Sequence, residues 1–206
     1  SSSFYHYPFF ADTCLLFGVT QSTGQSIVWL KKVFQKKINS ISNEDILNHH
    51  NPLFFLPFLE GARTPHWDPD ARGVLFGLNS KHTLKDIYHA IYLGIAFNLF
   101  DNLQLILNNH QLTRKKFTIK VSGGGANNHF LNQMKADVLG QTIIQSSIKE
   151  SGLLGNAILA AVGLSIYQYK EAIDKMVHTE HIYYPDQKRQ QFYQSQLYPI
   201  YESLYL

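Results

Sequence analysis

A long run of helical periodicity in the middle of the chain constrains the fold more than any other feature. Apolar side chains recur every three or four residues over 83–107, at Leu84, Ile87, Ile91, Ile95, Leu99, Leu103 and Leu107. This spacing places them on one face of a helix and predicts a long amphipathic helix here. No stretch of the sequence reaches about 18 consecutive apolar residues, the length that a membrane span requires, so we expect no contact with a membrane.

The segments around this helix predict strands and helices in alternation. Short apolar runs predict strands at 14–19, 53–56, 74–76, 117–121 and 142–145. Helical spacing predicts helices at 24–38, 128–139 and 152–167, the last apolar nearly all round and therefore expected to be buried. The tail, 168–206, predicts one or two polar helices. This order of elements is typical of an α/β fold.

The composition narrows the class of protein. Hydrophobic residues make up 45% of the 206 residues and charged residues 16%, which excludes a disordered chain and suits a single domain. The formal net charge of only +3 argues against a nucleic-acid partner. Cys14 is the single cysteine, which excludes a disulfide framework and a multi-thiolate zinc site. We expect it to be a core residue, and a lone thiol suits the reducing cytoplasm.

A glycine-rich turn lies between the strand predicted at 117–121 and the helix predicted at 128–139. Three glycines in Ser122–Ala126 remove the side chains where the backbone enters the helix, so a ligand could approach the amides and the positive end of the helix dipole. The segment lacks both the later spaced glycine of a Rossmann fingerprint and the Gly-Lys-Ser/Thr of a Walker A loop. From the glycines alone, a nucleotide site and a tight structural turn are about equally supported.

No cluster of residues predicts a bound metal. Asp68 and Asp70 are spaced like the first two ligands of an EF-hand loop, but Arg72 occupies the next ligand position, so we expect a rigid, ion-paired loop instead. His178 and His181 would share one face if the tail were helical there. Without a third ligand, a solvated surface is the better interpretation.

Four segments, in order, resemble motifs of the C-terminal domain of the FGGY carbohydrate kinases. They are Leu56–Gly73 (LPFLEGARTPHWDPDARG), Gly73–Leu78 (GVLFGL), Ser122–Ala126 (SGGGA) and Glu150–Ala161 (ESGLLGNAILAA). The resemblance covers about residues 4–205. It implies a ribonuclease H-like, actin-like ATPase fold with a mixed sheet flanked by helices, and one C-terminal domain over 1–206.

The same resemblance implies an activity and its partners. Members transfer the γ-phosphoryl group of ATP, with Mg²⁺, to a sugar hydroxyl, and the first segment is most similar to that of the kinases for D-xylulose, which form xylulose 5-phosphate. Gluconate, glycerol or ribulose as the acceptor, and a non-catalytic interaction module that retains the fold, stay open as alternatives. The family's catalytic base lies in an N-terminal sugar-binding domain, which is expected to be absent here and to be this domain's partner. We therefore expect no catalytic residue in 1–206 and no turnover by this chain alone; a homodimer is left open.

Finally, the resemblance implies which residues contact the nucleotide. The matching positions are Gly24, Gly123, Gly124, Gly125 and Asn128. Two positions depart from the family pattern: Val28 stands where some members have a polar nucleotide contact, and Leu93 stands where members usually carry Glu.

Overall fold

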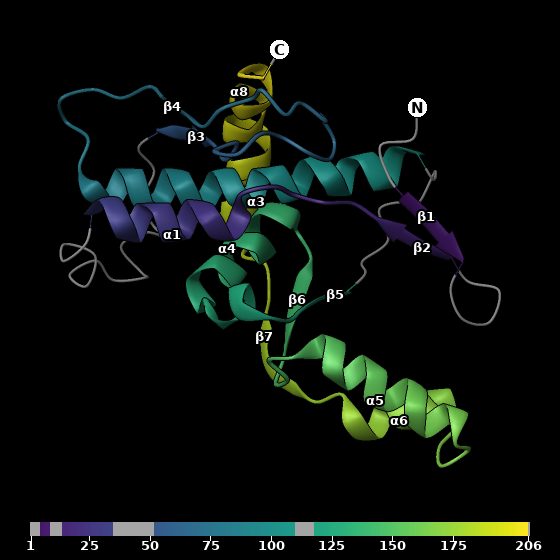
Figure 1. The fold of residues 1–206 in the computed structure, drawn as a ribbon. Coiled ribbons are helices and arrows are strands. Elements are labelled where there is room, and N and C mark those ends of the chain that lie inside the picture. The colour runs from purple at the N-terminus through teal and green to yellow at the C-terminus, as the bar shows by residue number, and fades with distance from the viewer. Residues whose placement is uncertain (1–4, 9–13, 35–51, 110–117, 206) are drawn as a thin grey trace.

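The computed structural model describes residues 5–8, 14–34, 52–109 and 118–205 (Figure 1). Its strands are β1 (Tyr5–Pro8), β2 (Cys14–Phe17), β3 (Phe54–Leu56), β4 (Val74–Phe76), β5 (Thr118–Val121), β6 (Thr142–Ser146) and β7 (Thr179–Tyr183). Its helices are α1 (Thr23–Phe34), α3 (Leu84–Asn109), α4 (His129–Leu139), α5 (Ser151–Gly163), α6 (Tyr169–Met176), α7 (Gln187–Phe192) and α8 (Tyr198–Ser203). A 3₁₀ helix, η2 (Gly124–Asn127), precedes α4, and a π-helical turn, η3 (Tyr193–Leu197), joins α7 to α8.

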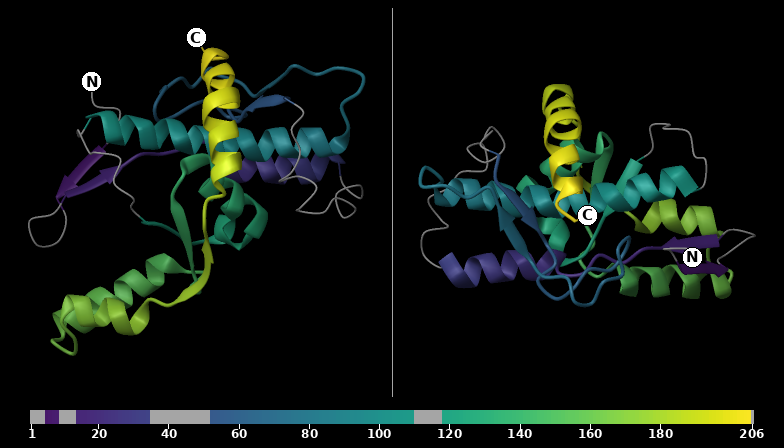
Figure 2. Two further views of the ribbon diagram at one scale, coloured as in Figure 1. Left: turned by 180° about the vertical axis from the view of Figure 1, so that it is seen from behind. Right: turned by 90° about the horizontal axis from the view of Figure 1, so that it is seen from above.

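Helix α3 confirms the predicted long helix and lies at the centre of the fold. Its first turn is fastened by Asp86, whose carboxylate accepts hydrogen bonds from the backbone amide and hydroxyl of Thr83, both at 2.6 Å. Helices α1, α4 and α8 and strand β3 all pack against it, as Figures 1 and 2 show. The middle of α3, around Ile91 and Ile95, is therefore buried on every side rather than on one face. The helix is long and apolar enough to cross a membrane, but most of it is buried inside the protein, as expected of a core helix.

Within the described residues, the strands form three separate sheets. Strands β1 and β2 pair antiparallel, as do β3 and β4. Strand β5 runs parallel to β6, and β7 pairs antiparallel with the other edge of β6, so this sheet is mixed. Helix α4 packs against β6 and β7. The expected α/β class and mixed sheet are thus present, and β5, η2 and α4 form one continuous strand–turn–helix unit.

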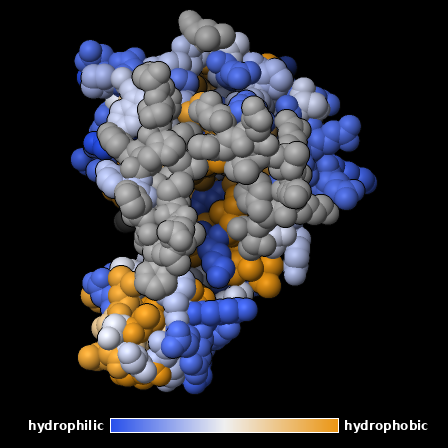
Figure 3. Space-filling model, turned by 90° about the vertical axis from the view of Figure 1, so that its right-hand side faces the viewer, coloured by the Kyte–Doolittle hydropathy of each residue, from blue (hydrophilic) through white to orange (hydrophobic). Residues whose placement is uncertain are grey.

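Helix α5 corrects one expectation from the sequence. Its apolar composition predicts a buried helix, but Leu153 and Leu159 are 68% and 51% exposed, and Ile158 is its one buried residue. The helix packs mainly against α6, at the lower end of the molecule in Figure 1. Figure 3 shows apolar side chains gathered over this lower part. An apolar composition indicates that other residues pack over a helix. It does not indicate that those residues belong to this domain.

The tail corrects a second expectation. Helices α6, α7 and α8 are present, but strand β7 lies between α6 and α7. His181 therefore lies on a strand that begins just after His178, and these two side chains do not share a helical face. Strand β7 is short and mostly exposed, so its sequence carries little hydrophobic alternation. The segment forms a strand because it pairs with β6, which lies about 35 residues earlier in the sequence.

Candidate functional site

The glycine turn leads from β5 into α4 in two steps. Gly123 has φ +81°, in the left-handed region that favours glycine, and its carbonyl accepts a hydrogen bond from the Ala126 amide at 3.0 Å. The chain then forms η2 before Asn128 starts α4 as its N-cap. Asn128 caps the helix through its side-chain oxygen, which accepts from the Leu131 amide at 3.0 Å.

The glycines differ in how much space surrounds them. At Gly61 an added Cβ would lie 2.9 Å from the Pro69 carbonyl oxygen, and at Gly94 it would overlap the Phe55 carbonyl oxygen. These glycines are required by packing. An added Cβ meets nothing within 4 Å at the four glycines predicted to contact nucleotide, Gly24, Gly123, Gly124 and Gly125, and the same holds for the α5 glycines Gly152, Gly155 and Gly163.

The turn itself explains only one of its three glycines. Gly123 is accounted for by its positive φ, whereas Gly124 and Gly125 have neither a positive φ nor a close neighbour. Their bare backbone faces open space next to the start of α4. The α5 glycines are equally open, but they lie within a helix, whereas Gly124 and Gly125 lie just before the start of one. Their position together with their open surroundings favours the ligand-binding interpretation of the turn over the purely structural one.

Asn128 is held in one orientation by a residue of α3. While its oxygen caps α4, its side-chain nitrogen donates to the Tyr92 hydroxyl at 3.0 Å. The Tyr92 ring also packs edge-on against Phe130, with centroids 4.7 Å apart. Burial raises the pKa of Tyr92, so its hydroxyl stays protonated at neutral pH. Tyr92 thus ties the glycine turn to the central helix, and nothing in the sequence marks it for this role.

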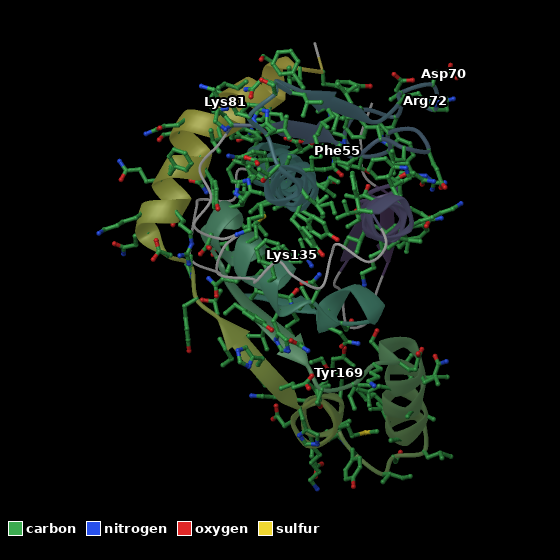
Figure 4. All side chains as sticks on the ribbon, turned by 90° about the vertical axis from the view of Figure 1, so that its left-hand side faces the viewer. Phe55, Asp70, Arg72, Lys81, Lys135 and Tyr169 are labelled. Carbon is green, nitrogen blue, oxygen red and sulfur yellow. The ribbon has the colours of Figure 1, made fainter. Side chains whose placement is uncertain are left out.

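A second amide supports the turn from one helical turn further along α4. The side chain of Asn132 is fully buried and donates to the Ala126 carbonyl at 2.7 Å. Its oxygen lies 3.4 Å from the amine of Lys135, which Figure 4 shows in the interior. Burial lowers the pKa of Lys135 to about 8. The signal that could identify Asn132 is its position: a polar residue four places after the cap, on the apolar face of a helix.

The start of α4 is also tied to the mixed sheet. A ring nitrogen of His129 hydrogen-bonds with the Tyr183 hydroxyl on β7. Tyr183 in turn donates to the Gln145 side chain on β6 at 2.8 Å. His129 is therefore anchored to the mixed sheet, while Asn128 is tied to α3.

Gly24 lies on a different element from the other predicted nucleotide contacts. It is in the first turn of α1, where the Ser26 hydroxyl donates to the Ser22 carbonyl at 2.7 Å. Helices α1 and α4 both pack against α3. Of the two departures from the family pattern, Val28 is 58% exposed on α1, and Leu93 is 2% exposed in the core.

The loop over residues 61–73 is fastened by hydrogen bonds to its own backbone. Asp68 accepts from the amides of Asp70 and Ala71 at 2.9 and 3.1 Å, and the Arg72 side chain donates to the carbonyls of Pro69 and Ala71. The expected rigidity is present, but these charged groups bond to backbone groups rather than to each other. Figure 4 places Asp70 and Arg72 at the outer edge. Within the described part of the chain, no group of three His, Cys, Asp or Glu side chains could hold a metal ion.

Comparison with known proteins gives one family. The model of the C-terminal domain of the FGGY family of carbohydrate kinases matches residues 7–164. A xylulose kinase of Staphylococcus epidermidis is 32% identical over 203 residues, which cover 94% of this chain and 39% of that protein. A ligand-bound xylulose kinase from Lactobacillus acidophilus superposes with a TM-score of 0.82 at 28% identity, covering 98% of this chain and 41% of that chain. A gluconate kinase from Lactobacillus acidophilus gives 0.83, with the same identity and coverage.

The chain therefore belongs to the FGGY family of carbohydrate kinases, as a C-terminal domain with the actin-like ATPase fold. The family resemblance and the fold expected from the sequence are both confirmed. The chain spans about two fifths of the length of the curated relatives it matches, 39% for the Staphylococcus epidermidis protein.

Proposed function

We propose that residues 1–206 form a single C-terminal domain, the nucleotide-binding half of an ATP-dependent sugar kinase. The acceptor we propose is D-xylulose, which would be converted to xylulose 5-phosphate. The xylulose kinases among the relatives support this choice, while the gluconate kinase of equal structural similarity makes gluconate the first alternative to test. We propose the cytoplasm as the location, in keeping with the lone thiol.

The observation that carries the proposal is the open backbone at Gly124 and Gly125. Neither glycine is required by its conformation or by its neighbours, and both precede the amino end of an eleven-residue helix, α4. A ligand with negative charge gains from the exposed amides and the helix dipole at such a place. We assign the nucleotide contacts to Gly24, Gly123, Gly124, Gly125 and Asn128.

The residues of this chain would bind and orient the nucleotide rather than react with it. Phosphoryl transfer depends on positioning and charge neutralisation, with little covalent chemistry from the protein. Mg²⁺ would neutralise the phosphates; because the described residues offer no three-ligand cluster, it fits as an ion carried by the nucleotide. The Asn128 side chain is held by its hydrogen bonds to Tyr92 and to the Leu131 amide, so its amide group would meet the nucleoside in a fixed orientation.

The exposed apolar face of α5 supports a partner domain. Leu153 and Leu159 project from a helix whose composition is that of a buried element. Large exposed apolar surface of this kind marks an interaction site. We propose that the kinase's own N-terminal domain covers it and supplies both the sugar site and the catalytic base, closing over the nucleotide to exclude water.

The test is a phosphorylation assay on the complete kinase with D-xylulose, D-gluconate, glycerol and D-ribulose. We expect ATP-dependent phosphate transfer with the highest kcat/KM for D-xylulose, and loss of activity in Gly124→Val. A higher kcat/KM for another acceptor would reassign the substrate. Tight ADP binding with no transfer to any sugar would instead favour the non-catalytic module.

A further inference from the structure

The residue that follows Asn128 has a side chain whose hydrogen bonding is set by the mixed sheet. His129 is the first residue of α4, directly after the cap, and it is exposed. Helix α4 packs against β6 and β7, as Figure 1 shows, and the His129 ring hydrogen-bonds there with Tyr183. From Tyr183 the hydrogen bonds continue to Gln145 on β6 and then to Glu180 on β7.

The direction of these hydrogen bonds follows from the carboxylate at their far end. An ionised carboxylate can only accept, so the Gln145 side-chain nitrogen donates to Glu180, at 2.9 Å. The Gln145 side-chain oxygen therefore faces Tyr183 and accepts from its hydroxyl at 2.8 Å. Burial raises the pKa of Tyr183, so this hydroxyl keeps its proton at neutral pH.

These directions fix the proton on the His129 ring. The Tyr183 hydroxyl has a single proton and donates it to Gln145, so in the bond with His129 the hydroxyl accepts and Nδ1 of the ring donates. A neutral imidazole with its proton on Nδ1 carries a bare lone pair on Nε2. Among the described residues Nε2 has no hydrogen-bond partner. An exposed residue next to Asn128 thus carries an unused acceptor.

An acceptor is what the glycine turn itself lacks. The turn and the first turn of α4 offer backbone N–H groups, which suit the oxygens of phosphates. Asn128 already uses its side-chain oxygen to cap the helix. A nucleoside, however, also carries donors, namely the 6-amino group of adenine and the ribose hydroxyls. The ring of His181 lies edge-on to that of His129, with centroids 5.4 Å apart, which limits how far the His129 ring can turn.

We infer that His129 binds the nucleoside by accepting, through Nε2, a hydrogen bond from one of these donors. Tyr183, with Gln145 and Glu180 behind it, is then a positioning residue that keeps the proton on Nδ1. The inference rests on the proposed nucleotide site at the glycine turn. A site that accepts a hydrogen bond from a ligand discriminates against the analogue that lacks the donor, so His129 would select the nucleoside.

The state of the ring is tested without any nucleotide. Side-chain ¹⁵N NMR of the 206-residue chain at about pH 8, above the usual titration range of imidazole, reports which nitrogen of His129 is protonated. The signals lost in His129→Asn assign the residue. We expect the proton on Nδ1, and loss of this preference in Tyr183→Phe. A proton on Nε2 in the unaltered chain would overturn the inference, and the same preference for Nδ1 in Tyr183→Phe would overturn the positioning role.

The contact is tested by titrating ADP and three analogues into the unaltered chain and His129→Asn. Purine riboside diphosphate lacks the 6-amino group, and 2′-deoxy-ADP and 3′-deoxy-ADP each lack one ribose hydroxyl. Asparagine keeps a donor for Tyr183 but has no acceptor in place of Nε2. We expect one analogue to bind about fivefold more weakly than ADP to the unaltered chain, and this difference to disappear in His129→Asn. That analogue identifies the donor.

Two further variants sharpen the comparison. His129→Gln supplies an oxygen near the place of Nε2 and should restore part of the difference between ADP and the analogue. His178→Asn, at another exposed histidine, is the matched control and should leave the difference unchanged.

The outcomes separate this inference from the proposed nucleotide site. If ADP binds but all three analogues bind equally well, or if the difference persists in His129→Asn, the role of His129 is overturned and the nucleotide site stands. If ADP does not bind, the nucleotide site is contradicted and the inference falls with it.

Discussion

At the scale of single residues, the glycine turn depends on side chains that lie far from it in the sequence. Asn128 takes its orientation from Tyr92, which is 36 positions earlier, through a hydrogen bond of 3.0 Å. One such bond contributes about 1 kcal/mol net to stability, enough to fix a rotamer. Tyr92 is thus a positioning residue for the proposed nucleotide site.

Tyr92→Phe should therefore weaken ADP binding about two- to tenfold, because the Asn128 amide loses its support, and lower the free energy of unfolding by about 1 kcal/mol. Titration of ADP and urea denaturation measure the two effects. Tyr88→Phe is the control, since the buried Tyr88 hydroxyl has no hydrogen-bond partner in the described part of the chain. Equal affinity for ADP in Tyr92→Phe and the unaltered protein would contradict the positioning role.

Asp101 makes the stability of the domain depend on pH. Burial raises its pKa to about 6, with Glu202 adding to the effect, while the Tyr198 hydrogen bond opposes it. The carboxyl group of an unfolded chain titrates near 4, so the folded state binds the proton more tightly. This contribution is complete below about pH 4 and is lost as pH rises through about 6.

Asp101→Asn should accordingly stabilise the protein more at about pH 7.5 than at about pH 5, by about 1 kcal/mol. The asparagine oxygen still accepts from Tyr198, so the packing is preserved. Urea denaturation of both proteins at the two pH values measures the difference. The same stability change at both pH values would show that Asp101 does not titrate in this range.

At the scale of elements, the close crossing of α3 and β3 organises the core. Gly94 allows it, because any side chain there would overlap the Phe55 backbone oxygen. Both elements are buried, so neither can move aside without opening the core. Gly94 is thus required by packing, whereas Gly124 is not.

Gly94→Ala should lower the free energy of unfolding by about 1–3 kcal/mol or more, the usual cost of overpacking. Gly124→Ala should change it by less than about 0.5 kcal/mol, as at other open positions. Thermal or urea denaturation compares the two variants directly. Similar losses at both positions would mean that Gly124 is structural too, and would remove the main support for a ligand at the turn.

Local patterns predict the elements well where a segment carries its own signal. Helical periodicity is sufficient to predict α3 and α4, and short apolar runs are sufficient to predict β3, β5 and β6. Strand β7, the exposure of α5 and the Tyr92–Asn128 bond escape prediction because each depends on contacts between distant segments. The glycines expected to contact the nucleotide were identified from the family resemblance. The open space around them is apparent only from the structure.

At the scale of the whole molecule, α5 and α6 stand out as a part whose apolar surface is not covered by the described residues. Figure 3 shows this surface on the lower part of the protein. We attribute it to an interface with the N-terminal domain. If α5 lies in such an interface, a substitution on its apolar face should affect the stability of the complete kinase more than the stability of the 206-residue chain.

The double variant Leu153→Gln/Leu159→Gln should change the stability of the 206-residue chain by less than about 0.5 kcal/mol, since both side chains are exposed there. In the complete kinase it should cost about 2 kcal/mol or more, because two buried apolar side chains are lost. Denaturation of both proteins with and without the substitutions gives the comparison. A small effect in both would contradict a domain interface at α5.

The central claim is that the open glycine turn before α4 binds the nucleotide. The most direct measurement is a titration of ADP into the 206-residue chain, followed through the adenine protons by ligand-observed NMR, with Gly124→Val and Gly152→Val as a matched pair. Both glycines have open surroundings, so neither variant should disturb the fold. The account predicts saturable ADP contact that is lost in Gly124→Val and unchanged in Gly152→Val. Equal ADP contact in all three proteins would contradict it.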